Sequence, residues 1–302
     1  MDIQQLLYLV KSIDNGNISQ TAQELNISQP AVTKGIKKLE TELQARLIVR
    51  HGKGIKATST GETLYRHAKA ILNQVKRATD DIEFTKGNRP ESLSIGCSPS
   101  FIDGTLPAIM SAFLKLWPTC TLNLTTTLYT ELITALKNGE LDAVLALDFH
   151  SHSVSDIHVE VLGQSEIAFI VNPNHPLATV DTLSVEQMNT ARWIILDATD
   201  TVAYFQSLFQ SSGLTPINPV VYSQSMSIIK SSLLSNELIG FLPKHMVENE
   251  LKNASLVRVN VDVPVRKMDL ILAHNDSLFP SAMLKGFLDI AANVVADSAQ
   301  RA

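Results

Sequence analysis

The sequence has little of what several common classes of protein require. Its 302 residues include only two cysteines, Cys97 and Cys120, which excludes a disulfide-stapled scaffold and is typical of a reduced, cytoplasmic chain. No apolar run of roughly 18 residues is present, so no membrane-spanning helix is expected. Lys11 and Asp14 interrupt the first apolar stretch, which argues against a secretory signal. With 45% hydrophobic and 18% charged residues, the composition predicts a globular protein that does not associate with membranes.

Motifs of common catalytic and metal-binding classes are missing as well. There is no phosphate-binding P-loop, no dinucleotide-binding glycine pattern and no His-Glu-x-x-His zinc motif. Residues 149–158 contain His150, His152, His158 and Asp156, which could be imagined as zinc ligands. No cysteine or second cluster accompanies them, and a polar loop is the simpler interpretation. We therefore expect no metal, no cofactor and no catalytic residue.

The net charge of −5 hides an uneven distribution. Residues 1–90 contain 14 Lys and Arg against 9 Asp and Glu, a net charge of +5, so the rest of the chain carries −10. A basic first part on an acidic body indicates that the first part meets a polyanion such as nucleic acid and the body does not. Chance clustering of charge is the alternative.

Residues 3–43 follow the pattern of three short helices. Apolar residues at helical spacing predict a first helix over residues 3–13, which Asn15-Gly16 would end. A short second helix over residues 21–25 would be capped by Asn17 or Ser19. Asn26 then suits the left-handed conformation that a tight turn requires.

The third helix has a distinctive polar face. Ser28 is expected to cap it, and Pro30 falls in the first turn, where its missing N–H costs little. Its buried stripe would consist of Val32, Ile36, Leu39 and Leu43. The opposite face carries amide, hydroxyl and ammonium groups on Gln29, Thr33, Lys34, Lys37 and Lys38. Such groups can reach base edges and phosphates in a major groove, whereas the alternative is an ordinary amphipathic helix with a solvated lysine face.

The stretch from Ala22 to Leu43 resembles the N-terminal winged helix-turn-helix of the LysR-type transcriptional regulators. It follows the pattern A-x-x-L-x-x-S-Q-P-A-V-x-x-x-I-x-x-L-E-x-x-L. The resemblance implies that the third helix reads double-stranded DNA, with base-facing residues Gln29, Pro30, Thr33 and Lys34 and phosphate-facing residues Ser28 and Lys38. Many members of the family have Arg where this chain has Lys34; Arg binds guanine through two donors, whereas Lys is a point charge.

Residues 47–58, LIVRHGKGIKAT, predict a β-hairpin, because two short apolar runs flank a turn with two glycines. In the family this hairpin is the wing. The resemblance implies that four residues lie along the DNA backbone or the minor groove: Arg50, His51, Lys53 and Lys56. An ordinary hairpin with solvated charges is the alternative for any one of them.

A long helix is expected after the hairpin. Residues 59–62, Ser-Thr-Gly-Glu, read as a capping box, and neither proline nor glycine occurs from there to Lys86. A heptad seam follows Leu64, Ala68, Ile71, Val75, Ala78 and Ile82. The seam either packs on its own domain or forms a coiled-coil dimer, and its narrowness favours the dimer, as does the resemblance. A dimer would read an interrupted palindrome. The two alanines weaken the seam, so the C-terminal domains are expected to help hold the dimer together. We expect the complete assembly to be a homotetramer.

Residues 87–90, Gly-Asn-Arg-Pro, would end this helix, and strand-like and helix-like segments alternate after them. Helices are expected near 105–116 and 129–138. Strands are expected at 92–97, 121–127, 141–147, 167–171, 193–197, 220–222, 239–243 and 269–273. Buried apolar strands between helices indicate a parallel-rich α/β fold.

The family resemblance extends more loosely over this part, through residues 174–177 (Asn-His-Pro-Leu) and 240–243 (Gly-Phe-Leu-Pro). It implies a two-lobed effector domain over 91–302 that is similar to the type II periplasmic binding proteins. Lobe one would comprise 91–161 and 268–302, and lobe two 162–267. The winged helix-turn-helix would then occupy 1–58, and the dimerising linker helix and hinge 59–90.

A small effector is expected between the lobes, since open parallel sheets bind ligands beyond the carboxyl ends of their strands. We select six hydroxyl-bearing residues from the loops that follow the expected strands: Ser98, Ser100, Thr127, Thr199, Thr201 and Ser223. Hydroxyls and free N–H groups at a helix start suit a carboxylate, but basic partners are missing, so a polar neutral ligand is the alternative. Each residue alone is also explained as a plain helix cap. Cys97 borders these loops, and we expect both cysteines to be inert and not a redox pair.

Two interpretations of different classes follow. The first is a transcriptional regulator controlled by a small-molecule effector, with no enzyme activity. The second is a metabolite-converting or metabolite-binding protein with an accessory DNA-binding domain, for which we find no convincing nucleophile–base or carboxylate pair. A DNA-bending protein without an effector is a third possibility.

Overall fold

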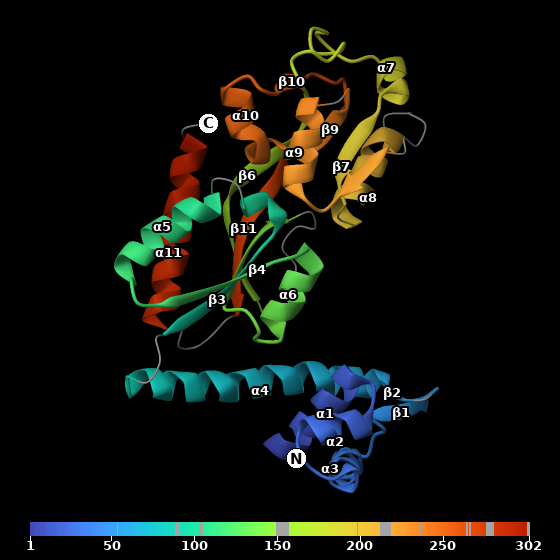
Figure 1. Ribbon diagram of the computed structural model, residues 1–302, viewed down its shortest axis with the longest axis vertical. Helices are drawn as coiled ribbons and strands as arrows, with labels where there is room; N and C mark the ends of the chain where they lie inside the picture. Colours follow the sequence, from blue (N-terminus) through green and yellow to red (C-terminus); the bar gives the residue numbers. More distant parts are fainter. Residues whose placement is uncertain are drawn as a thin grey trace. The chain divides into compact units, whose positions relative to one another are not determined.

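The computed structural model describes residues 1–52, 54–87, 91–102, 105–148, 157–197, 199–211, 219–235, 237–263, 265, 267–275 and 281–300 (Figure 1). Internal contacts divide the chain into two compact units. The first unit comprises Met1–Leu93, Thr119–Thr121 and Ile133–Asp142, and the second comprises Ser94–Pro118, Leu122–Leu132 and Ala143–Ala302. None of the described helices combines the length and the apolar character that crossing a membrane requires.

The first unit begins with three helices, a hairpin and a long helix, as predicted. The helices are α1 (Ile3–Asn15), α2 (Ile18–Glu24), α3 (Gln29–Glu42) and α4 (Ser59–Thr85), and the hairpin strands are β1 (Ile48–His51) and β2 (Gly54–Ala57). Gly16 ends α1 in the left-handed region at φ 60°, and Asn26 takes φ 54° in the turn between α2 and α3. Both turn predictions are confirmed.

The apolar faces of α1, α2 and α3 meet in one core. Leu9, Val32 and Leu39 are fully buried there, and Ala22 allows the close approach of α2. The ring of Tyr8 lies so close to α3 that a Cβ at Gly35 would stand 2.5 Å from Tyr8 Cδ2. A side chain at position 35 would therefore push α1 away from α3.

The predicted apolar stripes of α1 and α3 extend beyond the core at one end of each helix. Ile3 is 51% exposed and Leu43 is 43% exposed, although both follow the apolar spacing of their helices. Ile3 stands at the first position of α1, and Leu43 lies at the C-cap of α3, so neighbouring helices do not cover them. The periodicity identifies the face of a helix but not how far along it the core reaches.

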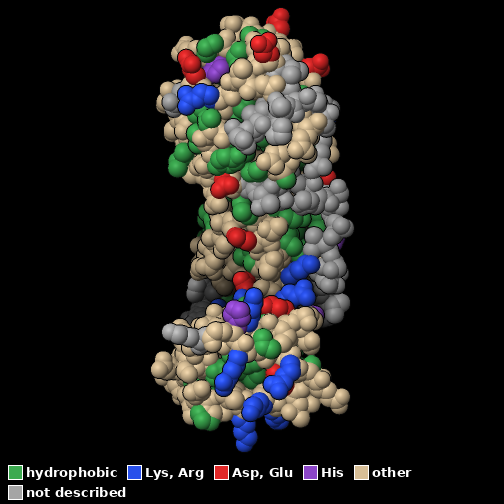
Figure 2. All heavy atoms as spheres, turned by 90° about the vertical axis from the view of Figure 1, so that its right-hand side faces the viewer, with side chains coloured by type: hydrophobic (Ala, Val, Ile, Leu, Met, Phe, Trp, Pro, Cys, Tyr) green, Lys and Arg blue, Asp and Glu red, His purple; other side chains and the backbone are tan. Residues whose placement is uncertain are grey.

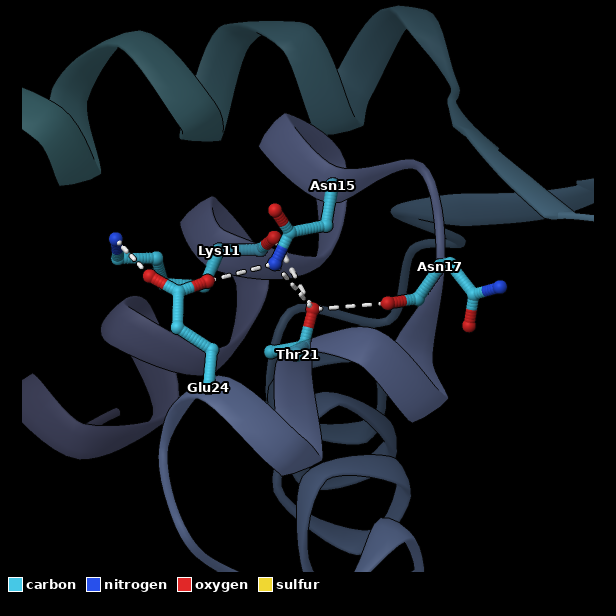
Figure 3. Close-up of polar contacts among 5 residues, drawn as sticks. All are labelled: Lys11, Asn15, Asn17, Thr21 and Glu24. Carbon is cyan, nitrogen blue, oxygen red and sulfur yellow. Dashed lines mark hydrogen bonds and ion pairs between the residues drawn. The ribbon is translucent and has the colours of Figure 1, made fainter.

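A polar network joins α1 to α2 (Figure 3). The side chain of Thr21 is fully buried, and its Oγ1 lies 3.1 Å from the carbonyl oxygen of Lys11 and 2.9 Å from that of Asn17. Asn15 Nδ2 donates to Thr21 Oγ1 at 3.3 Å and to a carboxylate oxygen of Glu24 at 2.8 Å. Lys11 Nζ pairs with the other Glu24 oxygen at 2.6 Å, and these contacts lower the pKa of Glu24. The network holds α2 in register on α1.

Replacing Thr21 with Val tests this network. The substitution keeps the shape of the side chain but removes the hydroxyl, so we expect the free energy of unfolding to fall by about 1 kcal/mol. Urea denaturation followed by circular dichroism measures the change. Thr41→Val is the matched control, because Thr41 is exposed and bonds only within its own helix, to the Lys37 carbonyl oxygen at 2.8 Å. Equal effects of the two substitutions would show that the network adds no stability.

The second strand of the hairpin is anchored, beside the turn, to the residue that ends α1. Ile55 N donates to the Gly16 carbonyl oxygen at 2.8 Å, and a Cβ at Gly54 would stand 2.3 Å from that oxygen. Thr58 caps α4 by accepting a bond from Gly61 N at 3.0 Å, so the N-cap lies one residue before the predicted capping box and the helix begins at Ser59. The correction follows from the backbone, because Thr58 N also donates to the Leu47 carbonyl oxygen at 3.0 Å and so holds the cap against the hairpin.

The seam of α4 is divided between two environments. Ala68 is fully buried against the three-helix core, and Leu64 packs beside it. Beyond this point the seam is open to solvent, with Ile71, Val75 and Ile82 at 38%, 40% and 54% exposure. The interpretation of a helix packed on its own domain thus holds only for the first turns of α4.

A second face of α4 binds residues 138–142, which belong to the same compact unit. The contacts come from residues spaced one helical turn apart on one side of the helix. They are Lys69 with Glu140 (2.9 Å), Asn73 Nδ2 with the Asn138 carbonyl oxygen (2.6 Å), and Arg77 with the Gly139 and Leu141 carbonyl oxygens (3.0 and 3.1 Å) and with Asp142 (2.9 Å). Salt bridges and backbone acceptors therefore occupy this face, and the apolar strip remains separate from it.

The second unit is built on a sheet in the order β4-β3-β5-β11-β6-β9-β7-β8, with β10 paired to β6. The strands are β3 (Ser92–Cys97), β4 (Thr121–Thr126), β5 (Ala143–Asp148), β6 (Ile157–Val171), β7 (Trp193–Leu196), β8 (Val221–Ser223), β9 (Ile239–Pro243), β10 (Val257–Val259) and β11 (Lys267–Asn275). The helices are α5 (Thr105–Leu116), α6 (Tyr129–Lys137), α7 (Val185–Thr190), α8 (Thr199–Ser211), α9 (Met226–Ser235), α10 (Glu248–Lys252) and α11 (Ala282–Gln300), and the 3₁₀ turns are η1 (Pro99–Phe101) and η2 (Lys244–Val247). All eight expected strand segments and both expected helices are confirmed.

Two long strands join the halves of the sheet. β11 pairs antiparallel with β5 and with β6, and its register on β6 shifts between Leu270 and Ile271. β6 then continues alone into the other half and pairs antiparallel with β9. The pairs β3–β5, β7–β8 and β7–β9 are parallel. Each half therefore follows the expected parallel α/β plan, and the connecting strands run antiparallel to it.

Aromatic side chains fill the core of each half. Trp193 is fully buried, stacks edge-on against Phe205 at 5.5 Å between ring centroids, and donates from Nε1 to the Met188 carbonyl oxygen at 3.1 Å. Trp117 stacks on Phe113 at 4.8 Å. Trp193 is a core residue, as the sequence predicts, whereas Trp117 is only half-buried.

Candidate DNA-binding surface and effector loops

The N-terminal turn of α3 presents most of the predicted base-reading residues to solvent. Ser28 caps the helix by accepting from Ala31 N at 3.4 Å. The side chains of Gln29, Pro30 and Lys34 are exposed, and Lys38 is exposed one turn further on. Because Val32, Ile36 and Leu39 point into the core, these polar residues lie on the opposite side of the helix. Lys and Arg side chains project from this unit at the bottom of Figure 2.

Thr33 is less available than its neighbours. It is half-buried, and its hydroxyl donates to the Gln29 carbonyl oxygen at 3.0 Å. Its methyl group and the free lone pairs of its oxygen are what it can offer to a base. Glu40, one of the two acids on α3, accepts from Leu47 N at 2.8 Å and from Ile48 N at 3.4 Å. The Glu40 carboxylate therefore faces the start of the hairpin.

The wing exposes its charged residues on two faces. Arg50, His51 and Lys56 are exposed, whereas Lys53 lies outside the described residues. Arg50 stands opposite Ile55 and Val49 opposite Lys56 in the antiparallel register. Side chains of directly opposed residues share a face, so Arg50 and Lys56 start from opposite faces of the ribbon.

The structure brings two of the six predicted effector residues together. Ser98 and Ser100 are buried, and their hydroxyl oxygens lie 2.5 Å apart. Both stand directly after β3, where Ser98 N donates to the Leu145 carbonyl oxygen of β5 at 2.9 Å. A pair of adjoining hydroxyls at the carboxyl end of a parallel strand can donate to and accept from a small polar ligand.

The other four residues have local roles or are undescribed. Thr127 donates to the Glu131 carboxylate within the start of α6, and Ser223 accepts from Ser225 N at 3.1 Å. Thr201 is buried in α8, and the side chain of Thr199 lies outside the described residues. For Thr127 and Ser223 these bonds match the plain capping role that the sequence also allows.

Sequence reasoning missed a buried histidine beside this hydroxyl pair. His245 lies in η2, and its Nε2 is 2.9 Å from the Ser100 carbonyl oxygen. Its Nδ1 is 2.7 Å from the hydroxyl of Ser165 on β6. A carbonyl only accepts, so Nε2 carries the proton and Nδ1 accepts from Ser165. No spacing motif marks His245, because its partners are distant in sequence.

Burial keeps the imidazole of His245 neutral. Loss of solvent lowers its pKa to about 4, although the bond to the Ser100 carbonyl and the charge of Glu248 act in the opposite direction. Burial also raises the pKa of the Cys97 thiol, which lies 3.4 Å from Thr126 Oγ1, and the pKa of Cys120. Both cysteines are free thiols, and their raised pKa values favour the unreactive form.

The histidine-rich segment adds no metal site to the described part of the chain. Residues 149–156, with His150, His152 and Asp156, lie outside the described residues. His158, the second residue of β6, lies beside His274 of β11, at 4.9 Å between ring centroids. Within the described ranges, no three His, Cys, Asp or Glu side chains gather as metal ligands would.

The exposed α3 and the hairpin that follows it define a winged helix-turn-helix. The α/β sheet forms a second domain, of the kind that binds small ligands. Residues 3–62 match the family described as bacterial regulatory helix-turn-helix protein, lysR family, and residues 86–296 match the LysR substrate binding domain. The chain belongs to the LysR family: it is a DNA-binding transcriptional regulator with an effector-binding domain.

Relatives cover nearly the whole chain. The uncharacterized HTH-type transcriptional regulator YwqM of Bacillus subtilis (strain 168) is 28% identical over 96% of this chain and 98% of its own. The HTH-type transcriptional regulator TdcA of Escherichia coli (strain K12) is 23% identical over 90% and 87%. ArgP from Mycobacterium tuberculosis has the same fold at a TM-score of 0.73, with 17% identity over 98% of each chain. Vibrio fischeri DarR in complex with DNA matches at a TM-score of 0.57, with 17% identity over 97% of this chain and 99% of its own.

The neutral His245 predicts a pH-dependent stability. Its pKa in the folded state lies below the usual 6.5, so its contribution is present above pH 6.5 and is lost as the pH falls toward 4. Between pH 7.5 and pH 5, we expect it to account for about 2 kcal/mol of lost stability. Urea denaturation at both pH values, compared between wild type and His245→Gln, isolates this contribution. If the two proteins lose equal stability, folding does not lower the pKa of His245.

Proposed function

We propose that this regulator binds an interrupted palindrome as a homodimer, and acts as a homotetramer, with a small effector bound at the loops that follow β3. We further propose the domain boundaries 1–58, 59–90 and 91–302, with lobe one at 91–161 and 268–302 and lobe two at 162–267. We also propose that it acts in the cytoplasm, where the operators of a bacterial regulator lie. The observation that carries the proposal is the exposed polar face of α3 on a helix whose other face is sealed into the core.

The roles of individual residues follow from their positions on that face. Gln29, Pro30, Thr33 and Lys34 lie in the first turns of α3, which is the part of a recognition helix that reaches base edges. Ser28 and Lys38 flank them and suit phosphates. Four wing residues, Arg50, His51, Lys53 and Lys56, are proposed to follow the DNA backbone or minor groove. Since Arg50 and Lys56 start from opposite faces of the ribbon, they would contact different phosphates.

Substitutions on α3 separate base reading from phosphate contact. We expect Gln29→Ala or Lys34→Ala to weaken binding to the specific operator by about 1–3 kcal/mol, because each removes a base contact. Lys38→Ala should weaken binding equally on all sequences and lower the salt dependence by about one phosphate contact. Fluorescence anisotropy at several salt concentrations measures both effects, on an operator selected from random duplexes and on a scrambled duplex.

The control for these measurements is Lys115→Ala, which removes an exposed lysine of α5 in the second unit. It should leave both affinities unchanged. If Gln29→Ala and Lys34→Ala leave the preference for the operator over the scrambled duplex intact, these residues do not read bases.

The apolar strip on α4 supports the dimer. Ile71, Val75 and Ile82 are exposed at heptad spacing, and Phe84 is 45% exposed at the same end of the helix. Salt bridges and backbone contacts occupy the face that binds residues 138–142, so the strip is left for another apolar surface. Burying such a strip against a second copy removes it from water, which is the driving force of a coiled coil.

A charge placed on the strip should prevent this pairing. We expect Val75→Asp to shift the protein to monomer at micromolar concentration, because two carboxylates would face each other across the seam. Analytical ultracentrifugation measures the mass, and operator affinity should fall with it. Gln74→Asp is the control, since it puts the same charge on an exposed polar position one residue away. A dimer that survives Val75→Asp would rule out this seam.

The effector proposal is supported by the adjoining hydroxyls of Ser98 and Ser100. Thr127, Thr199, Thr201 and Ser223 are proposed as further contacts, and a carboxylate is the proposed ligand class. We propose no enzyme activity for the chain. The alternative, a metabolite-converting protein with an accessory DNA-binding domain, would require a titratable pair beside the hydroxyls, and His245 already uses both nitrogens in structural bonds.

A further inference from the structure

His245 connects three segments that are far apart in the sequence. It follows β9, and its ring reaches Ser165 on β6 and the backbone of Ser100 in η1. In the proposed boundaries, His245 and Ser165 belong to lobe two and Ser100 belongs to lobe one. The 2.9 Å bond from Nε2 to the Ser100 carbonyl is therefore a bond between the lobes.

Ser165, the other partner of His245, lies at the point where the two halves of the sheet meet. Ser165 pairs with Met268 of β11, near the end of the stretch in which β6 is paired with β11. Two residues later, Ile167 pairs with Pro243 of β9. Ser165 thus stands where β6 passes from one half of the sheet to the other. A movement of one half against the other must change the geometry around this point.

The other end of the bond lies in the loop that carries the hydroxyl pair. Ser100 shares a hydrogen bond with Ser98, and Ser98 is tied to β5 through the Leu145 carbonyl. Phe101 N donates to the Ser98 carbonyl oxygen at 3.0 Å, and the buried Phe101 ring lies 6.4 Å from the ring of His245. The loop is therefore held on one side by β5 and on the other by His245.

We propose that His245 is a positioning residue of the effector site, which fixes the Ser98–Ser100 loop of lobe one to the changeover point of β6 in lobe two. The link makes the arrangement of the hydroxyl pair depend on the relative position of the lobes, and conversely. An effector that binds the hydroxyls would then act on the lobes through this bond. The inference rests on the proposed effector function for that last step alone.

The tautomer of His245 decides which ring nitrogen donates and which accepts. Ser165 donates its hydroxyl proton to Nδ1, which leaves Nε2 as the only protonated ring nitrogen and aims it at the Ser100 carbonyl. The depressed pKa of His245 is consistent with this, since the ring has one donor and one acceptor to satisfy and no bonded carboxylate to favour a second proton. Loss of either partner would leave a buried polar group without its bond.

Two amide substitutions separate the two ends of the ring. The nitrogen of a Gln amide reaches the position of Nε2, so His245→Gln keeps a donor toward the Ser100 carbonyl. The amide of Asn reaches only the position of Nδ1, so His245→Asn keeps the contact with Ser165 and breaks the bond between the lobes. Both variants place a neutral amide in the same buried space, and they therefore match each other as controls for packing.

Hydrogen exchange in the full-length protein gives the readout. In His245→Asn, we expect the backbone amides of Ser98 and Phe101 to exchange about tenfold faster than in wild type, as for the loss of one buried hydrogen bond. In His245→Gln they should stay within about twofold of wild type. Unchanged exchange in both variants, or equally faster exchange in both, would overturn the proposal. Should the His245 variants not fold, Ser165→Ala frees the ring at its other end and should speed exchange at the same two amides; no change there would also overturn it.

Footprints on the selected operator extend the test to DNA. The footprint of His245→Asn should differ in length from that of wild type, whereas that of His245→Gln should match it. Wild-type protein that protects no duplex would refute the proposed operator binding, and the exchange measurements would still decide the role of His245.

Discussion

The close packing of α1 on α3 is the constraint on which the DNA-binding surface depends. Tyr8 lies against the bare backbone of Gly35, and this contact presses Val32, Ile36 and Leu39 into the core. Because side chains leave a helix at 100° intervals, sealing one side of α3 turns Gln29, Lys34 and Lys38 outward together. The buried network around Thr21 holds α2 in place behind them (Figure 3). A lysine-rich helix becomes a recognition helix only when its opposite face is fixed.

The helix α4 shows how one amphipathic element serves several contacts. Its first turns complete the core of the helix trio through Ala68. Its middle uses Lys69, Asn73 and Arg77 to bind residues 138–142. Its apolar strip from Ile71 onward remains exposed in the single chain. These faces differ in chemistry, so core packing, polar docking and the proposed dimer seam do not compete for the same side chains.

The second unit depends on strands that are long enough to belong to both of its halves. β6 pairs with β11 over its first part and with β9 over its last part, so the backbone itself connects the two halves of the sheet. His245 adds a side-chain connection at the same place, between Ser165 and the loop of Ser98 and Ser100. Its burial excludes the charged form of the ring, and the neutral form has one donor and one acceptor for its two partners.

The sequence by itself determined the N-terminal elements, most strands after residue 92 and the family, because caps, turns and periodicity act over a few residues. The residue types of Gly16 and Asn26 indicate turns, and that of Ser28 indicates a helix cap. Most strands after residue 92 are recognisable in the sequence as apolar runs. Only the tertiary structure decided how much of each apolar stripe is buried, as the exposed Leu43 shows. It also decided that Thr58, held by the Leu47 carbonyl at the start of the hairpin, caps α4. It also decided that Ser98 and Ser100 meet and that His245 joins them across 145 positions. Contacts of this kind depend on where distant segments fold together, and no local spacing encodes them.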